Sequence, residues 1–112
     1  MERHEMIYEL KTYKATDGNI AALKKRFAEK TMPIFSRLGI EVTHCWDNLE
    51  DPNTFNYLVR FSSREAEKNA WDVFARDEEW KLVKMESEKL SGPLLASQST
   101  LYLSSTNFSP ND

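Results

Sequence analysis

Residues 40–61 have the sequence IEVTHCWDNLEDPNTFNYLVRF, and this stretch decides the fold. Within residues 40–48, apolar or aromatic side chains alternate with polar ones, and residues 55–61 repeat the alternation. An alternation of period two is typical of β-strands. The residues between them, 49–53 (LEDPN), have the composition of a turn. The stretch therefore predicts two antiparallel strands joined as a hairpin.

Two further strands are predicted outside the hairpin. Residues 5–15 (EMIYELKTYKA) mix Ile, Tyr and Thr in rough alternation, which puts Glu9 and Tyr13 on the same side of a strand. Residues 97–104 form an apolar segment near the end of the chain and predict the last strand.

A long helix is predicted between the first strand and the hairpin. Residues 16–18 (TDG) break the strand pattern and supply a capping side chain, and apolar residues then fall close to helical spacing as far as Gly39. Pro33 lies inside this helix, where it removes a backbone hydrogen bond and crowds the preceding turn. We therefore expect a kink or break at Thr31-Met32.

A second helical region is predicted after the hairpin. Ser62 and Glu65 have the spacing of a capping box, so this helix begins near Ser63. Asp77 has the position of a cap for a further short helix, which ends before Gly92.

This order of elements is that of a ferredoxin-like α+β fold, in which a four-stranded antiparallel sheet carries its helices on one face. The helices leave the other face bare. Apolar and aromatic residues of the hairpin fall on more than one parity: Val42, Trp46, Phe55, Tyr57, Leu58, Val59 and Phe61. Because a patch of that size is unusual on a soluble monomer, we expect a second copy of the chain to cover it, giving a homodimer.

Composition excludes several classes of protein. The 112 residues carry 15 Lys and Arg against 18 Asp and Glu, a net charge of −3, without a basic run, so no nucleic-acid partner is expected. No apolar stretch is long enough for a membrane span, and none resembles a signal peptide. The lone Cys45 fits a reducing compartment. These features predict a cytoplasmic protein with one domain over residues 1–105 and a polar tail over residues 106–112.

Several segments also resemble the NIPSNAP family. Residues 6–13 (MIYELKTY) resemble its opening strand, Trp46 stands where that family usually has a Trp, and residues 77–80 (DEEW) resemble its acidic helix start. Residues 94–98 and 108–110 are similar to its closing strand and tail. The resemblance implies a dimeric α+β barrel, in which two ferredoxin-like subunits pack sheet against sheet around a small cavity. It implies no established chemistry.

Glu9 and His44 are the candidate catalytic residues. Glu9 has apolar strand neighbours, and desolvation in an enclosed cavity would raise its pKa and make it a general base. The alternative is an ion pair of Glu9 with Lys11 or Arg60, which only satisfies charge on the sheet. His44 has no second metal ligand at a suitable spacing, and a lone strand histidine is more often hydrogen-bonded than metal-bound.

The candidate ligand-binding residues are Tyr13, His44, Trp46 and Tyr57. The aromatic members of this set either sandwich a planar ligand or pack in the core of a dimer interface. No metal is predicted, because no second ligand has a suitable spacing, and no cofactor is predicted, because the sequence has no Gly-rich phosphate loop. The absence of a Gly-x-Ser-x-Gly motif argues against a nucleophilic serine. His44 and Cys45 point to opposite faces of their strand, which argues against a Cys–His catalytic pair.

The sequence thus predicts a NIPSNAP-like dimeric barrel whose cavity holds a small apolar or aromatic molecule. One alternative is a cofactor-independent monooxygenase or isomerase that uses Glu9 or His44 as its base, by analogy with other dimeric α+β barrels. A second alternative is a pure protein-interaction module with a filled interior. The chemistry of the cavity distinguishes the three.

Overall fold

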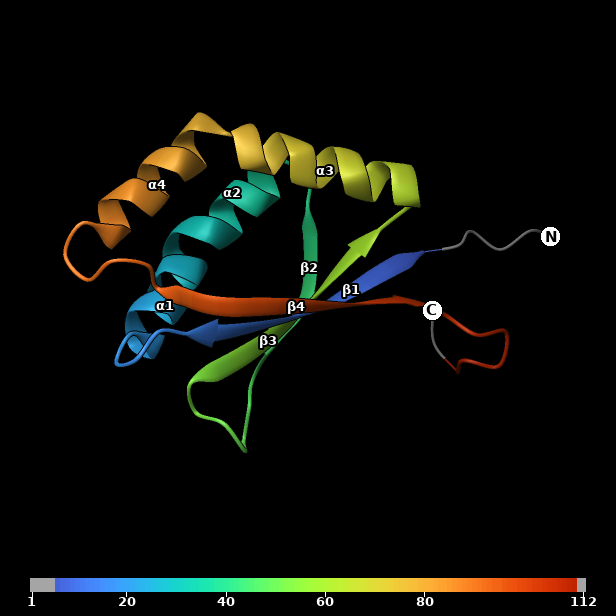
Figure 1. The fold of residues 1–112 in the computed structure, drawn as a ribbon. Coiled ribbons are helices and arrows are strands. Elements are labelled where there is room, and N and C mark those ends of the chain that lie inside the picture. The colour runs from blue at the N-terminus through green and yellow to red at the C-terminus, as the bar shows by residue number, and fades with distance from the viewer. Residues whose placement is uncertain (1–5, 111–112) are drawn as a thin grey trace.

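The computed structural model describes residues 6–110. The elements follow in the order β1 (Ile7–Ala15), α1 (Ile20–Arg26), a π-helical turn η1 (Phe27–Thr31), α2 (Met32–Arg37), β2 (Glu41–Asp47), β3 (Thr54–Phe61), α3 (Arg64–Arg76), α4 (Glu78–Glu88) and β4 (Leu95–Ser104). The strands form one antiparallel sheet in the order β2-β3-β1-β4 (Figure 1). This is the predicted ferredoxin-like α+β fold. None of the helices in residues 6–110 is long and apolar enough to cross a membrane.

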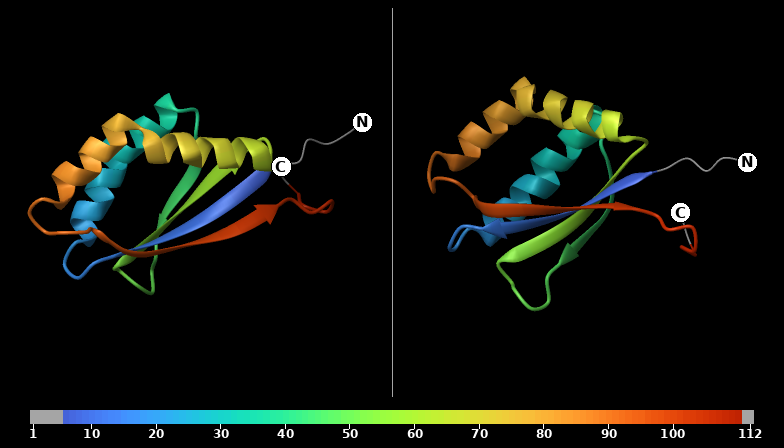
Figure 2. Two further views of the ribbon diagram at one scale, coloured as in Figure 1. Left: turned by 45° about the horizontal axis from the view of Figure 1, so that its top comes forward. Right: turned by 45° about the vertical axis from the view of Figure 1, so that its right-hand side comes forward.

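The helices all lie on one face of the sheet (Figure 2). Strand β3 supplies the centre of the core, because Phe55, Tyr57, Val59 and Phe61 all point toward the helices and are buried. The same face of β1 carries Glu9, which is paired with Val59 in the register. The helix-facing side of the sheet therefore combines an aromatic core with a buried carboxylate.

The other face of the sheet, which we call the open face, is covered by no element of the described chain. The register aligns Leu10 with Leu58 on one side and with Leu101 on the other, so three leucines lie side by side across β3, β1 and β4. Leu101 is 59% exposed and Leu103 is 44% exposed. The apolar character of this face comes mainly from these leucines, since the alternate residues of β3 turn toward the core.

Strand β2 contains a bulge that changes which residues share a face. Val42 is paired with Val59, whereas His44 is paired with Leu58, so one extra residue stands in β2 between the two pairs. An extra residue reverses the alternation beyond it. Val42 therefore faces the helices while His44 and Trp46 lie on the open face, and the prediction that these three share one side of the strand is wrong.

The predicted break in the first helical region is present as a change of helix type. Residues 27–31 form a π-helical turn that ends at Thr31, immediately before the turn that contains Pro33. Proline cannot donate a backbone hydrogen bond and crowds the carbonyl one turn earlier, and a wider turn accommodates it. Thr31 closes the widened turn, since its hydroxyl donates to the carbonyl of Arg26 at 3.5 Å.

Two of the predicted caps differ from those observed. The first helix begins after Asn19, which makes no capping bond and instead donates from its amide to the Thr16 hydroxyl. Ser63 rather than Ser62 caps α3, and its hydroxyl accepts from Ala66 N at 3.0 Å, so the predicted capping box does not form. The prediction for α4 is confirmed, since the Asp77 carboxylate accepts from the backbone nitrogen three residues later, at 2.9 Å.

Candidate functional site

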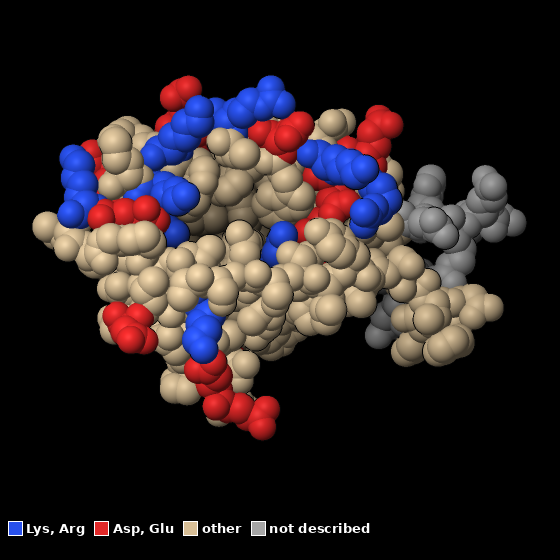
Figure 3. All heavy atoms as spheres, in the orientation of Figure 1, with Lys and Arg blue, Asp and Glu red and all other residues tan. Residues whose placement is uncertain are grey.

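A cavity of about 460 Å³ lies between the helix-facing side of the sheet and the helices. In Figure 3 a hollow is visible between α3 and α4 on one side and β4 on the other. Among its lining side chains are Lys11 and Tyr13 from β1, Arg26 from α1, Trp71 and Phe74 from α3, and Trp80, Lys84 and Glu88 from α4. Its lining thus combines aromatic rings with charged groups.

The bend between α3 and α4 positions the aromatic wall. Asp77 has an extended backbone there, so α4 leaves α3 at an angle and arches over the sheet (Figure 1). Phe74 and Trp80 stack across the bend, with ring centres 4.9 Å apart. Arg37 of α2 holds the bend from below, because its guanidinium donates to both oxygens of Asp77 at 2.8 Å and to Glu79 at 3.0 Å.

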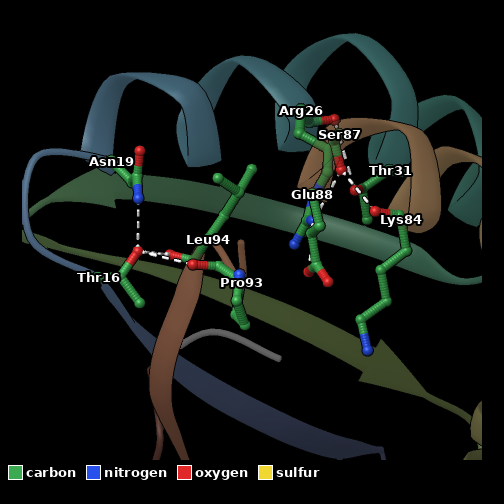
Figure 4. A network of polar contacts seen from close by, with 9 residues as sticks. All are labelled: Thr16, Asn19, Arg26, Thr31, Lys84, Ser87, Glu88, Pro93 and Leu94. Carbon is green, nitrogen blue, oxygen red and sulfur yellow. Dashed lines mark hydrogen bonds and ion pairs between the residues drawn. The ribbon is translucent and has the colours of Figure 1, made fainter. Parts of the chain in front are cut away.

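A second link joins α4 to α1 and closes one end of the cavity. The buried Arg26 donates from Nη1 to Ser87 Oγ at 3.0 Å and to Glu88 Oε2 at 3.3 Å (Figure 4). Its guanidinium also lies 5.2 Å from the centre of the Trp80 ring, a cation–π distance. Since α4 buries none of its own residues, these contacts, the Phe74–Trp80 stack and the Arg37–Asp77 pair help to hold α4 over the cavity.

Glu9 lies directly behind the cavity wall and fixes two of its side chains. It is 0% exposed, and the Trp71 indole Nε1–H donates to its Oε2 at 3.0 Å. Lys11 Nζ lies 3.0 Å from its Oε1 and also donates to Thr100 Oγ1 at 3.0 Å. The ammonium group is 4.7 Å from the Trp71 ring centre. Glu9 therefore sets the orientation of both Lys11 and Trp71.

Of the two ion pairs proposed for Glu9 from the sequence, only the one with Lys11 forms. Arg60 lies on the open face and pairs instead with Glu41, 2.7 Å away. A third group that the sequence did not suggest completes the cluster. Glu67 of α3 is buried and shares a hydrogen bond with the Glu9 carboxyl.

The two carboxyls of this cluster have pKa values displaced in opposite directions. Burial would raise the pKa of Glu9, but hydrogen bonds with Glu67, Trp71 and Lys11 outweigh it and leave that pKa lowered. The predicted rise at Glu9 is therefore wrong. Burial and the neighbouring Glu9 raise the pKa of Glu67 from 4.5 to about 7. Glu67 thus retains a proton at mildly acidic pH and donates it to the Glu9 carboxylate.

Two tyrosines form a hydrogen-bonded pair beside this cluster. The Tyr57 hydroxyl donates to the Tyr13 hydroxyl at 2.7 Å. Tyr57 is fully buried, whereas Tyr13 lines the cavity. Burial raises the pKa of both phenols, so both are neutral hydrogen-bond donors at physiological pH.

The structure divides the residues predicted for the site into two groups. Glu9, Tyr13 and Tyr57 lie together on the helix-facing side, at or behind the cavity wall. His44 and Trp46 lie on the open face, where their rings stack with centres 5.0 Å apart. The aromatic pocket of Tyr13, Tyr57 and Trp46 therefore does not form within the chain.

Sequence reasoning missed the contributions of the helices to this site. The predicted site residues include none of Trp71, Phe74 and Trp80, and neither Arg26 nor Lys84. The i,i+3 spacing of Trp71 and Phe74 indicates one apolar face, but not that part of this face borders a cavity. Among residues 6–110, no three His, Cys, Asp or Glu side chains gather as a metal site would require.

Comparison with known proteins places the chain in a family. The sequence model of the NIPSNAP family matches residues 8–110. An uncharacterized NIPSNAP domain protein from Burkholderia xenovorans has a similar structure, with a TM-score of 0.78 and 18% identity over 94% of this chain and 99% of that one. A NIPSNAP family protein of unknown function from Agrobacterium tumefaciens has a TM-score of 0.79 and 23% identity, over 97% of this chain and 96% of that one.

The fold extends beyond that family. A putative antibiotic biosynthesis monooxygenase from Nitrosomonas europaea gives a TM-score of 0.65 with 9% identity, over 96% of this chain and 95% of that one. At that identity the likeness concerns the fold alone. The comparison with curated proteins found no match. Since the family match spans nearly all of the described residues, the chain belongs to the NIPSNAP family.

Proposed function

We propose that this NIPSNAP protein binds a small molecule with a flat apolar or aromatic body in the cavity between its sheet and its helices. The observation that carries the proposal is the aromatic wall formed by Trp71, Phe74 and Trp80, which borders open space rather than packed side chains. Protein interiors are otherwise close-packed. A volume of about 460 Å³ is within the usual range of ligand pockets.

A ligand stacked against this wall gains both apolar burial and favourable ring geometry. The wall is held in place from behind, since Glu9 orients Trp71 and the Phe74–Trp80 stack bridges two helices. Such pre-organisation lowers the entropy cost of binding. This cavity lies on the helix side of the sheet, whereas the cavity of the predicted barrel lies between two sheets, so the interaction-module alternative, which concerns the barrel interior, stays open.

A cavity-filling substitution tests this proposal. The probe is 1-naphthalenemethanol, a neutral bicyclic aromatic alcohol, with affinity measured by isothermal titration calorimetry. Gln98→Trp adds a bulky ring to the lining, whereas Ser97→Trp places the same ring on the other side of β4. We expect about tenfold weaker binding with Gln98→Trp and unchanged binding with Ser97→Trp. Equal affinity in both variants, or no binding to the wild type, would reject the proposal.

We also propose that the protein is a homodimer in which two open faces pack against each other. The support is the leucine row Leu10, Leu58 and Leu101, together with Leu103 and Trp46 on the same face. Facing sheets bury such residues in the usual geometry of sheet packing. This arrangement leaves the ligand cavity inside each subunit, on the far side of the sheet from the interface.

A second candidate function is proton-transfer chemistry of the monooxygenase or isomerase kind. The observation that favours it is Glu67, a buried carboxyl with a pKa of about 7, which is suited to exchange protons. Neither Glu67 nor Glu9 lines the cavity, so a proton would have to pass by way of Lys11. The test measures oxygen uptake with an anthrone, a flat ketone with an acidic CH₂ group. Faster uptake with the wild-type protein than with the Glu67→Gln variant supports this candidate, and equal uptake rejects it.

A further inference from the structure

The hydroxyl pair at the cavity wall has two protons but makes only one hydrogen bond. Tyr13 and Tyr57 carry two hydroxyl protons but share a single hydrogen bond, and no other acceptor for either proton is present in residues 6–110. Tyr57 is 0% exposed, so an unpaired proton on its hydroxyl would be stranded in the core. The favourable arrangement has Tyr57 donating to Tyr13, which leaves the Tyr13 proton free to bond an acceptor within the cavity.

Arg26 offers a second set of unused donors. Its Nη1 is occupied by Ser87 and Glu88, whereas Nε and Nη2 meet no acceptor in the part of the chain that the structure describes. The N–H groups of Nε and Nη2 point in the same direction and match the two oxygens of a carboxylate. Arg26 also lies near Tyr13. Although burial dominates and raises the pKa of the phenol, the charge of Arg26 acts on it in the opposite direction.

The charges around the cavity leave one cation without a counterpart. Lys11 is paired with Glu9, and Arg26 is paired with Glu88. Lys84, which also lines the cavity, has no hydrogen bond or ion pair to its ammonium group within residues 6–110. Figure 4 shows this side chain extended from α4 with no contact drawn to its nitrogen. The lining therefore carries a positive excess.

We propose that the natural ligand is an aromatic carboxylate, whose two oxygens accept from Arg26 and Tyr13 while Lys84 attracts its charge and its rings lie against Trp71 and Trp80. This inference rests on the proposed function and names the chemical class of the ligand. An acceptor-rich anion fits this lining because its donors are unsatisfied and close to aromatic surface. A neutral hydrocarbon would leave those donors unpaired.

Three probes of one shape and different charge test the inference: 1-naphthoate, 1-naphthalenemethanol and 1-naphthylmethylammonium. Isothermal titration calorimetry gives each affinity at low and at physiological salt. We expect 1-naphthoate to bind at least about tenfold more tightly than the alcohol, and the ammonium compound to bind most weakly. Equal affinity for carboxylate and alcohol would overturn the inference but leave the proposed function standing. Binding of none of the probes would overturn both.

Variants identify the groups that recognise the carboxylate. Arg26→Lys keeps the charge but loses the paired donors, and Tyr13→Phe removes one hydroxyl. We expect each to reduce the naphthoate-to-alcohol affinity ratio by about fivefold to tenfold. Because the quantity is a ratio within each variant, it is read only from protein that still binds the alcohol. An unchanged ratio in both variants would contradict the assignment.

Lys84→Gln is a third variant. Because Lys84 is exposed, this substitution should disturb the fold least. Its matched control is Lys81→Gln, a change of the same kind on the same helix at a residue that does not line the cavity. We expect Lys84→Gln alone to weaken naphthoate binding, by about threefold, and the loss to shrink at high salt as exposed charges are screened. An equal loss of naphthoate affinity in Lys84→Gln and Lys81→Gln would mean that only the net charge of the protein matters, and it would refute the role of Lys84.

Discussion

Glu9 and Glu67 share one proton behind the cavity wall, and this pair makes the stability of the protein depend on pH. The pKa of Glu67 is raised from 4.5 to about 7 in the folded chain, so the folded state binds more protons than the unfolded state between those values. A group with a raised pKa stabilises the fold fully at low pH and loses that contribution as pH rises through its folded pKa. The lowered pKa of Glu9 has the opposite effect at more acidic pH.

We therefore expect the free energy of unfolding to fall as pH rises from about 5 to about 8. Glu67→Gln keeps a hydrogen-bond donor beside Glu9 but cannot titrate, so this fall should be much smaller in that variant. The cations that act on Glu67 are Arg64 and Lys11, and both lower its pKa against the larger effects of burial and Glu9. Urea unfolding at several pH values measures the effect. Glu65→Gln, an exposed change on the same helix, should behave like the wild type, and an undiminished fall in Glu67→Gln contradicts the account.

Residues on a regular strand could be placed from the sequence, whereas their partners on helices could not. The alternation of β1 put Glu9 and Tyr13 on one side, and both lie there in the structure. Glu67 and Trp71, which decide the protonation and orientation of Glu9, come from α3. How a helix is rotated on a sheet depends on the packing of many side chains at once, so the pairing could not be read from spacing.

Helix α4 is the element on which the cavity most depends and the one with the least burial of its own. It contributes Trp80 and Lys84 to the lining but has no buried residue. Its first turn is stabilised by the Asp77 carboxylate, which accepts from Trp80 N and also binds Arg37. The element is thus held by a cap, by the ring contacts of Trp80 and by a few polar contacts rather than by fully buried residues of its own.

We expect Asp77→Ala to destabilise the protein by about 1 kcal/mol, the usual cost of losing a helix cap. Hydrogen exchange should accelerate in residues 78–88 far more than in α3, and affinity for 1-naphthalenemethanol should fall because Trp80 is less well held. Asp72→Ala removes an exposed carboxylate within α3 and serves as the control. Uniform acceleration of exchange across both helices would contradict a local role for the cap.

The elements themselves were largely predictable, and the differences have local causes. The alternation of side chains predicted the strands and the order of the elements, the turn composition of residues 49–53 predicted the hairpin, and Pro33 predicted the break in the first helix. The bulge in β2 did not, because residues 40–48 alternate without interruption in sequence and only pairing with β3 reveals the extra residue. It moves His44 and Trp46 to the open face and thereby separates them from the site.

For the whole molecule, the open face and the cavity are two surfaces on opposite sides of one sheet, and they make independent predictions. We expect Leu101→Arg to convert the proposed dimer to a monomer, because it places a charge in the leucine row at the interface. Leu82→Arg on α4 is the matched control, since Leu82 is 54% exposed and Leu101 is 59% exposed. Sedimentation velocity distinguishes the two. A wild type that sediments as a monomer would contradict the dimer but leave the cavity unaffected.

The most direct test of the ligand cavity uses the three tryptophan indole N–H signals in a ¹H–¹⁵N correlation spectrum, assigned by Trp→Phe substitution. Trp71 and Trp80 line the cavity, whereas Trp46 lies on the open face. Titration with 1-naphthoate should shift the signals of Trp71 and Trp80 together and saturably, and leave that of Trp46 in place. A shift confined to Trp46, or no saturable shift at all, would contradict the account.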